Sequence, residues 1–223
     1  MPYGYTGQNL INQTVKNSGV FSISDVYNLQ KQGKFGGTLQ LIEEQTASGV
    51  STIEFTNLKE QKYDVHYLVG TVHLVGTTDT NYEYTLRVSN DGGSSYESGS
   101  NYQYAYQNCK AESSSFNERQ DTSATGFRFD GVVDKTNASA NFYMYIYNLG
   151  SSSIFTSLTF QDTSIISSDR RTRSRFGGQV YTVAETNNAL QFSQNATNFD
   201  TGTNIKLYGV KQIIDVSWNV KDV

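Results

Sequence analysis

The sequence has a single cysteine, Cys109, only two methionines and no long run of apolar residues. One cysteine cannot form an intrachain disulfide, so the chain does not look like a secreted disulfide scaffold. No stretch approaches the roughly 18 apolar residues of a membrane span, and residues 1–5 lack the basic and apolar regions that open a signal peptide. We therefore expect a soluble protein that is synthesised in a reducing cytoplasm and does not insert into membranes.

Charged residues are also scarce. They form 17% of the chain and leave a net charge of −4. The protein as a whole therefore has no electrostatic attraction to nucleic acid or to an anionic membrane. We expect no nucleic-acid partner.

Aromatic residues and glycine are abundant instead. The chain has 16 tyrosines, 12 phenylalanines and 19 glycines, a profile unlike that of a helical bundle. Hydrophobic residues make up only 36% of the chain, but aromatic side chains bury a large area each and can fill a core between two sheets. The length of 223 residues suits one large all-β domain or two small ones.

Polar and apolar residues alternate with the two-residue period of a strand in many segments. Residues 204–211 show this most clearly, and a strand so far along the chain must pair with much earlier strands. Turns rich in Ser, Asn and Gly separate the segments without a helical crossover, which predicts about nine or ten antiparallel strands. The other expected strands span residues 52–58, 62–75, 82–88, 102–106, 127–133, 141–148, 153–162, 174–181 and 189–192.

Two glycine-containing sites within this pattern carry further expectations. Gly70 and Thr71 fall inside the segment 62–75 and predict a break or a bulge in that strand. The Asn-Asp-Gly-Gly run at residues 90–93 predicts a hairpin turn.

The N-terminal residues lack strand alternation at first. Residues 1–20 are polar and without a period, which predicts an extended arm. Ser22 or Ser24 can cap a short helix near residues 24–32, and Gly33 can end it. Residues 38–45 form a plausible strand or the lead-in to one.

These patterns together predict an all-β chain. We expect an antiparallel jelly-roll-like β-sandwich over residues 51–213. An N-terminal arm and attachment segment with one short helix precedes it over residues 1–50, and a C-terminal extension follows over residues 214–223.

Four segments stand out for their order along the chain: 53–63 (IEFTNLKEQKY), 90–96 (NDGGSSY), 143–147 (YMYIY) and 206–211 (KLYGVK). In this order they resemble a group of β-sandwich virion proteins from tailed bacteriophages, encoded among tail-fibre and capsid-associated genes. Residues 1–7 and 19–34 resemble the starts of marine cyanophage structural proteins. The resemblance implies a virion protein made in the host cytoplasm. The residues after Ile213 lie where such proteins often stop, so the extension is expected to serve contacts of its own.

Within a virion, the favoured role is a tail fibre or other tail-associated appendage. It would dock on other virion subunits by its N-terminal arm and contact the host surface, where a glycan or a protein is the candidate partner. A capsid decoration or head-fibre protein is the alternative, and a carbohydrate-binding or sugar-degrading module is a second one. Such appendages commonly assemble three-fold, so a homotrimer is expected by analogy. The side chains expected to dock on the virion are Tyr3, Tyr5, Val20, Phe21, Val26 and Leu29.

The sequence offers little for catalysis or metal binding. No spacing fixes a pair of carboxylates or a nucleophile with its base, so we do not expect an enzyme. His66 and His73 would fall on opposite faces of an unbroken strand, which predicts two partly exposed histidines and not a pair of metal ligands. Cys109 has only Lys110 as a basic neighbour, which predicts a packed or inert thiol. No cofactor or metal is expected.

Arg170, Arg171, Arg173 and Arg175 form the one concentrated charge feature of the chain. Their guanidinium groups suit contact with an anionic sugar, a phosphate or an acidic patch on a neighbouring subunit. The alternative is a solvated loop whose charges keep a sheet edge from self-pairing. Closely spaced arginines repel one another unless an opposite charge neutralises them. Both interpretations stay open.

Tyrosine recurs at every second position in three segments. These ladders are Tyr82 with Tyr84, Tyr102 with Tyr104 and Tyr106, and Tyr143 with Tyr145 and Tyr147. They admit a carbohydrate-stacking interpretation. Core or intersubunit packing is favoured, because tyrosine at a two-residue period is typical of an interior face with wet edges.

Overall fold

The computed structural model describes most of the chain from Thr38 onward. The described residues are 38–75, 81–111, 116–132, 139–166, 171–195 and 197–211, together with Ser24 and Tyr27. The chain divides into two units, residues 1–38 and 39–223. Ser24 and Tyr27 are helical, and the rest of the helix expected near residues 24–32 lies outside the described residues.

The described residues form twelve β-strands, all in the second unit. They are β1 (Leu39–Ala47), β2 (Thr52–Phe55), β3 (Val65–Val72), β4 (Asn81–Ser89), β5 (Tyr102–Lys110), β6 (Asn117–Ala124), β7 (Phe127–Val132), β8 (Ala140–Tyr147), β9 (Thr156–Ile166), β10 (Arg171–Tyr181), β11 (Ala189–Gln194) and β12 (Thr203–Val210).

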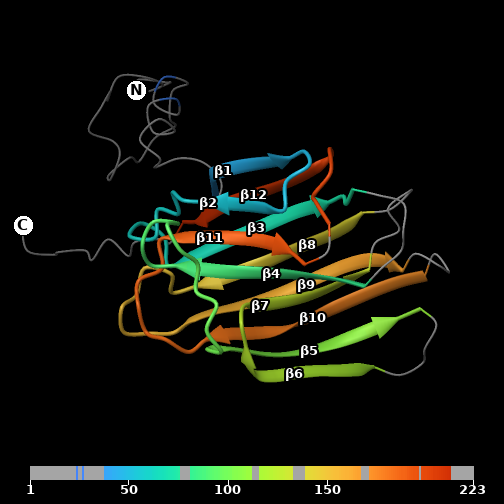
Figure 1. Cartoon of the computed structure of the whole chain (residues 1–223). Helices are drawn as coiled ribbons and strands as arrows, with labels where there is room; N and C mark the ends of the chain where they lie inside the picture. Colours follow the sequence, from blue (N-terminus) through green and yellow to red (C-terminus); the bar gives the residue numbers. More distant parts are fainter. Residues whose placement is uncertain are drawn as a thin grey trace, which may run out of the picture. The chain divides into compact units, whose positions relative to one another are not determined.

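The strands form two antiparallel sheets that pack face to face (Figure 1). An eight-stranded sheet has the order β1-β12-β3-β8-β9-β10-β5-β6, and a four-stranded sheet has the order β2-β11-β4-β7. The prediction of an all-β antiparallel sandwich is therefore confirmed.

Nested pairing gives this sandwich a jelly-roll topology. β1 pairs with β12, β2 with β11, β3 with β8 and β4 with β7. Strands β1 to β4 thus form one arm of a long hairpin. The other arm consists of β7, β8, β11 and β12. Rolling up this hairpin places β12 beside β3 and β11 beside β4. Eight strands wound in this way make the two Greek keys of a jelly roll.

Four inserted strands widen one sheet only. β5 and β6 lie between β4 and β7 in the chain, and β9 and β10 lie between β8 and β11. They attach beside β8 in the order β9-β10-β5-β6 (Figure 1). The outer face of the large sheet is therefore a broad surface, made of jelly-roll strands on one side and of inserted strands on the other.

Aromatic rings fill the core between the sheets. The ring of Phe192 in β11 stacks on Tyr84 with 5.6 Å between centroids and on Phe142 with 5.3 Å, and Phe199 lies 5.7 Å from Phe192. All four residues are buried. Because Tyr84 and Phe192 belong to the small sheet and Phe142 to the large one, these rings hold the two sheets together.

The first strand falls within the residues assigned to the N-terminal segment. β1 pairs with β12 and contributes Ala47 to the core, so the sandwich begins at Leu39 and includes residues 39–50. The pairing register shifts between Leu41 and Glu43. This bulge changes the side-chain alternation and explains why the sequence pattern of the strand is weak.

Two glycine predictions need correction. Gly70 does not interrupt β3; a Cβ atom there would lie 2.9 Å from both the Asn204 carbonyl oxygen and Ile205 Cγ1, so glycine permits close approach of β12. Gly92 and Gly93 do take positive φ angles of 76° and 90°. Their turn is not a hairpin, because β4 and β5 belong to different sheets.

Candidate functional site

Several predicted site residues cannot be located in the fold. Tyr3, Tyr5, Val20, Phe21, Val26, Leu29 and Arg170 lie outside the described residues. The structure does place the other three arginines, the two histidines and most of the tyrosine ladders.

The three described arginines of the run do not lie in a solvated loop at a sheet edge. Arg171, Arg173 and Arg175 lie in β10, an interior strand between β9 and β5. Exposure decreases along this strand, from the exposed Arg171 through the half-buried Arg173 to Arg175, which is 1% exposed. The loop interpretation is therefore wrong for these three residues, and Arg175 cannot reach an external anion.

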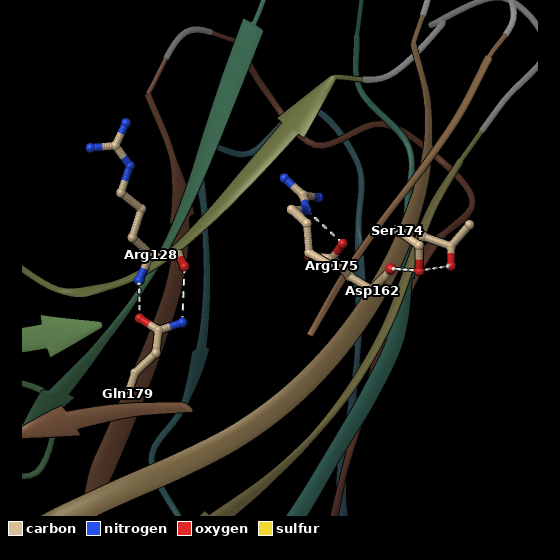
Figure 2. A network of polar contacts seen from close by, with 6 residues as sticks. Arg128, Asp162, Ser174, Arg175 and Gln179 are labelled. Carbon is tan, nitrogen blue, oxygen red and sulfur yellow. Dashed lines mark hydrogen bonds and ion pairs between the residues drawn. The ribbon is translucent and has the colours of Figure 1, made fainter. Parts of the chain in front are cut away.

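Arg175 is paired with Asp162 inside the sandwich (Figure 2). Its Nε donates to Asp162 Oδ1 at 2.7 Å, and the Asp162 side chain is 5% exposed. The two residues are direct partners on β10 and β9. An unpaired charge is costly to bury, so the ion pair lowers the free-energy cost of burying each of the two charges. Asp162 thus neutralises one of the arginine charges from within the fold.

A small cavity adjoins this ion pair. Its volume is about 10 Å³, and its lining includes Arg175, Asp162 and Tyr84. The Nη1 atom of Arg175 is buried and forms no hydrogen bond in the part of the chain that the structure describes. The cavity has about the size of one water molecule, which could accept a hydrogen bond from Nη1.

His66 is fully buried, contrary to its predicted partial exposure, whereas His73 is half-buried as predicted. Its Nε2 donates to the Leu58 carbonyl at 2.8 Å, and its ring meets Tyr63 edge-on. Burial lowers the pKa of His66, while the hydrogen bond to Leu58 and the charges of Glu60 and Asp64 act in the opposite direction. Among the residues that the structure describes, no group of three or more His, Cys, Asp or Glu side chains could hold a metal ion.

The tyrosine ladders divide between the core and the solvent. The buried members, which pack in the core as favoured from the sequence, are Tyr84, Tyr102, Tyr104 and Tyr106. In β8 the pattern is reversed: Tyr143 and Tyr145 are 40% and 36% exposed, whereas Met144 and Ile146 are buried. The β8 ladder therefore faces outward from the large sheet.

Tyr143 and Tyr145 belong to a cluster of four tyrosines on this outer face. We name this cluster, which is completed by Tyr67 of β3 and Tyr208 of β12, the tyrosine platform. The ring centroid of Tyr67 lies 4.9 Å from that of Tyr145 and 6.2 Å from those of Tyr143 and Tyr208, with interplanar angles between 37° and 46°. Partial burial and the neighbouring phenol groups raise the pKa of Tyr67. The four rings thus form one continuous aromatic surface.

The pairing register continues the platform as a row across the sheet. Tyr208, Tyr67 and Tyr145 are direct partners on β12, β3 and β8. The row then runs through Thr159 of β9, Gly178 of β10 and Ala105 of β5. Along this row the side chains therefore change from large aromatic ones to small ones where the inserted strands begin.

A shallow groove lies over these small residues. We name it the sheet groove; its volume is about 770 Å³, and its lining comes from β5, β6, β9 and β10. Ala105 and Gly178 contribute no long side chain and form its floor. The side chains around them include Gln103, Gln120, Ser157, Thr159 and Val180.

A second hollow adjoins the platform farther along the same strands. Its volume is about 510 Å³, and β12, β3, β8 and β9 line it. Tyr143 is part of the lining, and its hydroxyl donates to Gln161 Oε1 at 2.7 Å. Thr71 Oγ1 likewise donates to Asn141 Oδ1 at 2.9 Å. Amide and hydroxyl groups thus lie beside the platform in this hollow as well as in the sheet groove.

The two hollows carry little net charge. Among the described residues, Asp121 is the only charged one that lines the sheet groove. In the second hollow, Lys206 Nζ lies 3.3 Å from Glu44 Oε1, and the Asp162 side chain is turned inward onto Arg175. This outer face is therefore suited to binding by stacking and by hydrogen bonds between neutral groups.

Comparisons with protein-family models, with curated proteins and with solved structures find no match. In the described part of the chain, no helix has the length and apolar character needed to cross a bilayer.

Proposed function

We propose that this chain is a structural protein of a tailed-bacteriophage particle, a tail fibre or tail-associated appendage without enzymatic activity. In this role the N-terminal segment attaches to neighbouring virion subunits, and the β-sandwich faces outward toward the host surface. Copies of the chain assemble with one another, by analogy as a trimer.

The sequence resemblance to virion proteins supports this class of function. The jelly-roll topology is compatible with it, because jelly rolls occur in viral capsid domains and in lectins. A fold alone does not specify a function. Support for the contact role therefore has to come from the surface of the sheet.

The tyrosine platform is the observation that carries the contact role. Tyr143 and Tyr145 expose 40% and 36% of their surface in the middle of a broad sheet face. An exposed aromatic cluster with polar groups around it is typical of an interaction site. An outward-facing appendage offers such a surface to a partner.

Immunogold labelling of intact particles tests this proposal. The antibody is raised against residues 39–211, and label confined to the tail is expected. Label spread over the head would replace the proposal with a capsid decoration or head-fibre protein. Particles that carry neither label nor peptides of this chain by mass spectrometry would contradict any virion role.

A further inference from the structure

We propose that the tyrosine platform and the sheet groove together bind a neutral polysaccharide. The inference assigns a ligand class to the outward face of the proposed appendage, and it rests on that proposed function. Its test uses the purified full chain in solution, so its failure and a failure of the particle labelling are separate results.

The platform supplies the stacking surface. The π face of an aromatic ring carries partial negative charge and attracts the C–H groups that a sugar ring presents on its less polar side. Tyr67, Tyr145 and Tyr208 are direct partners on adjacent strands, which lie about 4.8 Å apart. This spacing is comparable with the length of one hexopyranose unit, so consecutive sugars of one chain can meet consecutive tyrosines.

Amide and hydroxyl groups beside the rings supply the polar contacts. Asn141 and Gln161 line the hollow farther along the strands of the platform, and Gln103 and Gln120 line the sheet groove across the sheet from it. Each amide offers both a donor and an acceptor, as does each sugar hydroxyl. An aromatic surface with a few such polar groups is the usual composition of a site that binds by orientation and contact area.

The lack of a side chain at Gly178 keeps the floor of the sheet groove low. The packing of the neighbouring strands does not require a glycine at this position. A Cβ atom at Gly178 would meet nothing closer than the Leu158 carbonyl oxygen at 3.7 Å. Its neighbour Gly177 is different, since a Cβ atom there would lie 2.4 Å from Tyr106 Cβ. The missing side chain at Gly178 therefore leaves open space on the outer face, in line with the row of tyrosines.

The charges favour a neutral ligand over an anionic one. Asp121 is the only charged residue in the described lining of the sheet groove, and it would repel an acidic sugar. Lys206 is already paired with Glu44. Arg175 is buried and paired with Asp162, so it cannot serve an external carboxylate or sulfate.

Affinity electrophoresis of the full chain tests the inference directly. The gels contain hydroxyethyl cellulose, dextran or galactomannan as neutral probes and alginate as the anionic probe. We expect retardation by at least one neutral polysaccharide and none by alginate. Retardation by alginate alone, or by no polysaccharide, would overturn the proposal.

Three variants locate the binding surface. Tyr145→Ala removes a central ring, and Gly178→Val fills the groove floor; each should weaken binding to the retarding polysaccharide about tenfold or more. Tyr27→Ala, which removes an exposed tyrosine outside the sandwich, is the matched control and should bind like the parent. Equal binding by all three variants would overturn the assignment to this face.

Sedimentation velocity separates the polysaccharide from a second copy of the chain as occupant. The Tyr145→Ala and parent chains should have the same oligomeric state. A parent oligomer that Tyr145→Ala dissociates would assign the face to self-association and overturn the proposal. Gly178→Val keeps the test valid if Tyr145→Ala fails to fold, because the valine enters open space.

Discussion

Gln179 and Arg128 join the two sheets of the sandwich by a pair of hydrogen bonds (Figure 2). The Gln179 side-chain amide, on β10 of the large sheet, accepts from the Arg128 main-chain N–H at 2.7 Å and donates to the Arg128 carbonyl at 2.9 Å. Arg128 lies on β7, the edge strand of the small sheet. A single side chain therefore takes the place of a neighbouring strand at this position.

Replacing Gln179 by leucine should destabilise the sandwich. The Gln179→Leu variant leaves both polar groups of the Arg128 main chain without their partner, and we expect the free energy of unfolding to fall by about 1–3 kcal/mol. Urea unfolding followed by fluorescence measures this. Gln120→Leu, at an exposed position of β6, is the control and should change the stability little. Equal stability of the two variants would mean that water replaces the Gln179 amide at no cost.

The ion pair of Arg175 with Asp162 should behave as a unit. Arg175→Met leaves a buried carboxylate without its counter-charge, and a loss of about 3–5 kcal/mol is expected. The double variant Arg175→Met/Asp162→Leu should recover most of this loss, because an apolar pair of similar volume has no charge to desolvate. Denaturant unfolding of both single variants and the double variant gives the coupling energy. Arg171→Met, at an exposed position of the same strand, is the control. Additive single effects would argue against a coupled pair.

Burial of His66 should make the sandwich less stable in mild acid. Because the pKa of folded His66 is lowered from 6.5, the unfolded chain binds more protons at this site once the pH falls below about 6.5. The contribution of neutral His66 to stability is complete above that pH. This contribution is lost as the pH falls toward the lower pKa of the folded state. Unfolding free energies at pH 7.5, 6.5 and 5.5 measure the slope.

The variants His66→Gln and His73→Gln assign this slope to a residue. His66→Gln retains a donor for the Leu58 carbonyl but cannot take up the proton, so its stability should depend less on pH than that of the parent. His73→Gln leaves His66 in place and should keep the parent's pH dependence. An unchanged slope in His66→Gln would assign the acid sensitivity to other groups.

Two adjacent glycines should respond oppositely to alanine. Gly177→Ala places a methyl group 2.4 Å from Tyr106 Cβ and 2.5 Å from the Ala105 carbonyl oxygen, so the paired strands must separate and a loss of about 1–3 kcal/mol is expected. Gly178→Ala meets only open space and should be neutral or stabilising by up to about 1 kcal/mol, since alanine restricts the unfolded chain. Thermal unfolding of the two variants under one condition makes the comparison. Equal losses of stability would show that strand conformation, and not the contact with β5, determines the effect of both substitutions.

Two deletions should separate the N-terminal unit from the sandwich. Removal of residues 1–38 should leave the stability of the sandwich nearly unchanged, because the second unit begins at Leu39. Removal of residues 1–47 also deletes β1 and exposes the edge of β12. We expect that deletion to lower the unfolding free energy by at least about 2 kcal/mol, since several main-chain hydrogen bonds are lost. Similar stability of the two truncated chains would mean that β1 adds nothing to the fold.

Strands with one buried face could be predicted from the sequence, and strands without such a face could not. β12 alternates fully between buried and half-buried residues, so its period is visible in its composition. β6 exposes almost every residue and is held by main-chain pairing with β5. A polar edge strand of this kind has no apolar period to reveal it.

The direction in which a side chain points was equally hidden from the sequence. Tyr104 and Tyr145 both occur in tyrosine ladders, yet Tyr104 is buried and Tyr145 faces solvent. Alternation divides a strand into two faces but does not say which face meets the second sheet. The same limit applies to Arg175, whose partner Asp162 lies on a different strand and comes into contact only through the register of β9 with β10.

The nested pairing of the jelly roll also governs when the chain can fold. Glu44 on β1 accepts a hydrogen bond from Asn204 on β12, and 160 residues separate the two in sequence. At translation rates of roughly 5–20 residues per second, β1 leaves the ribosome on the order of ten seconds before its partner strand exists. Such distant pairing also makes folding intrinsically slow. The sandwich is therefore completed only once β12 has been made, and during that interval its unpaired strands are natural substrates for the chaperones of the cell that makes it.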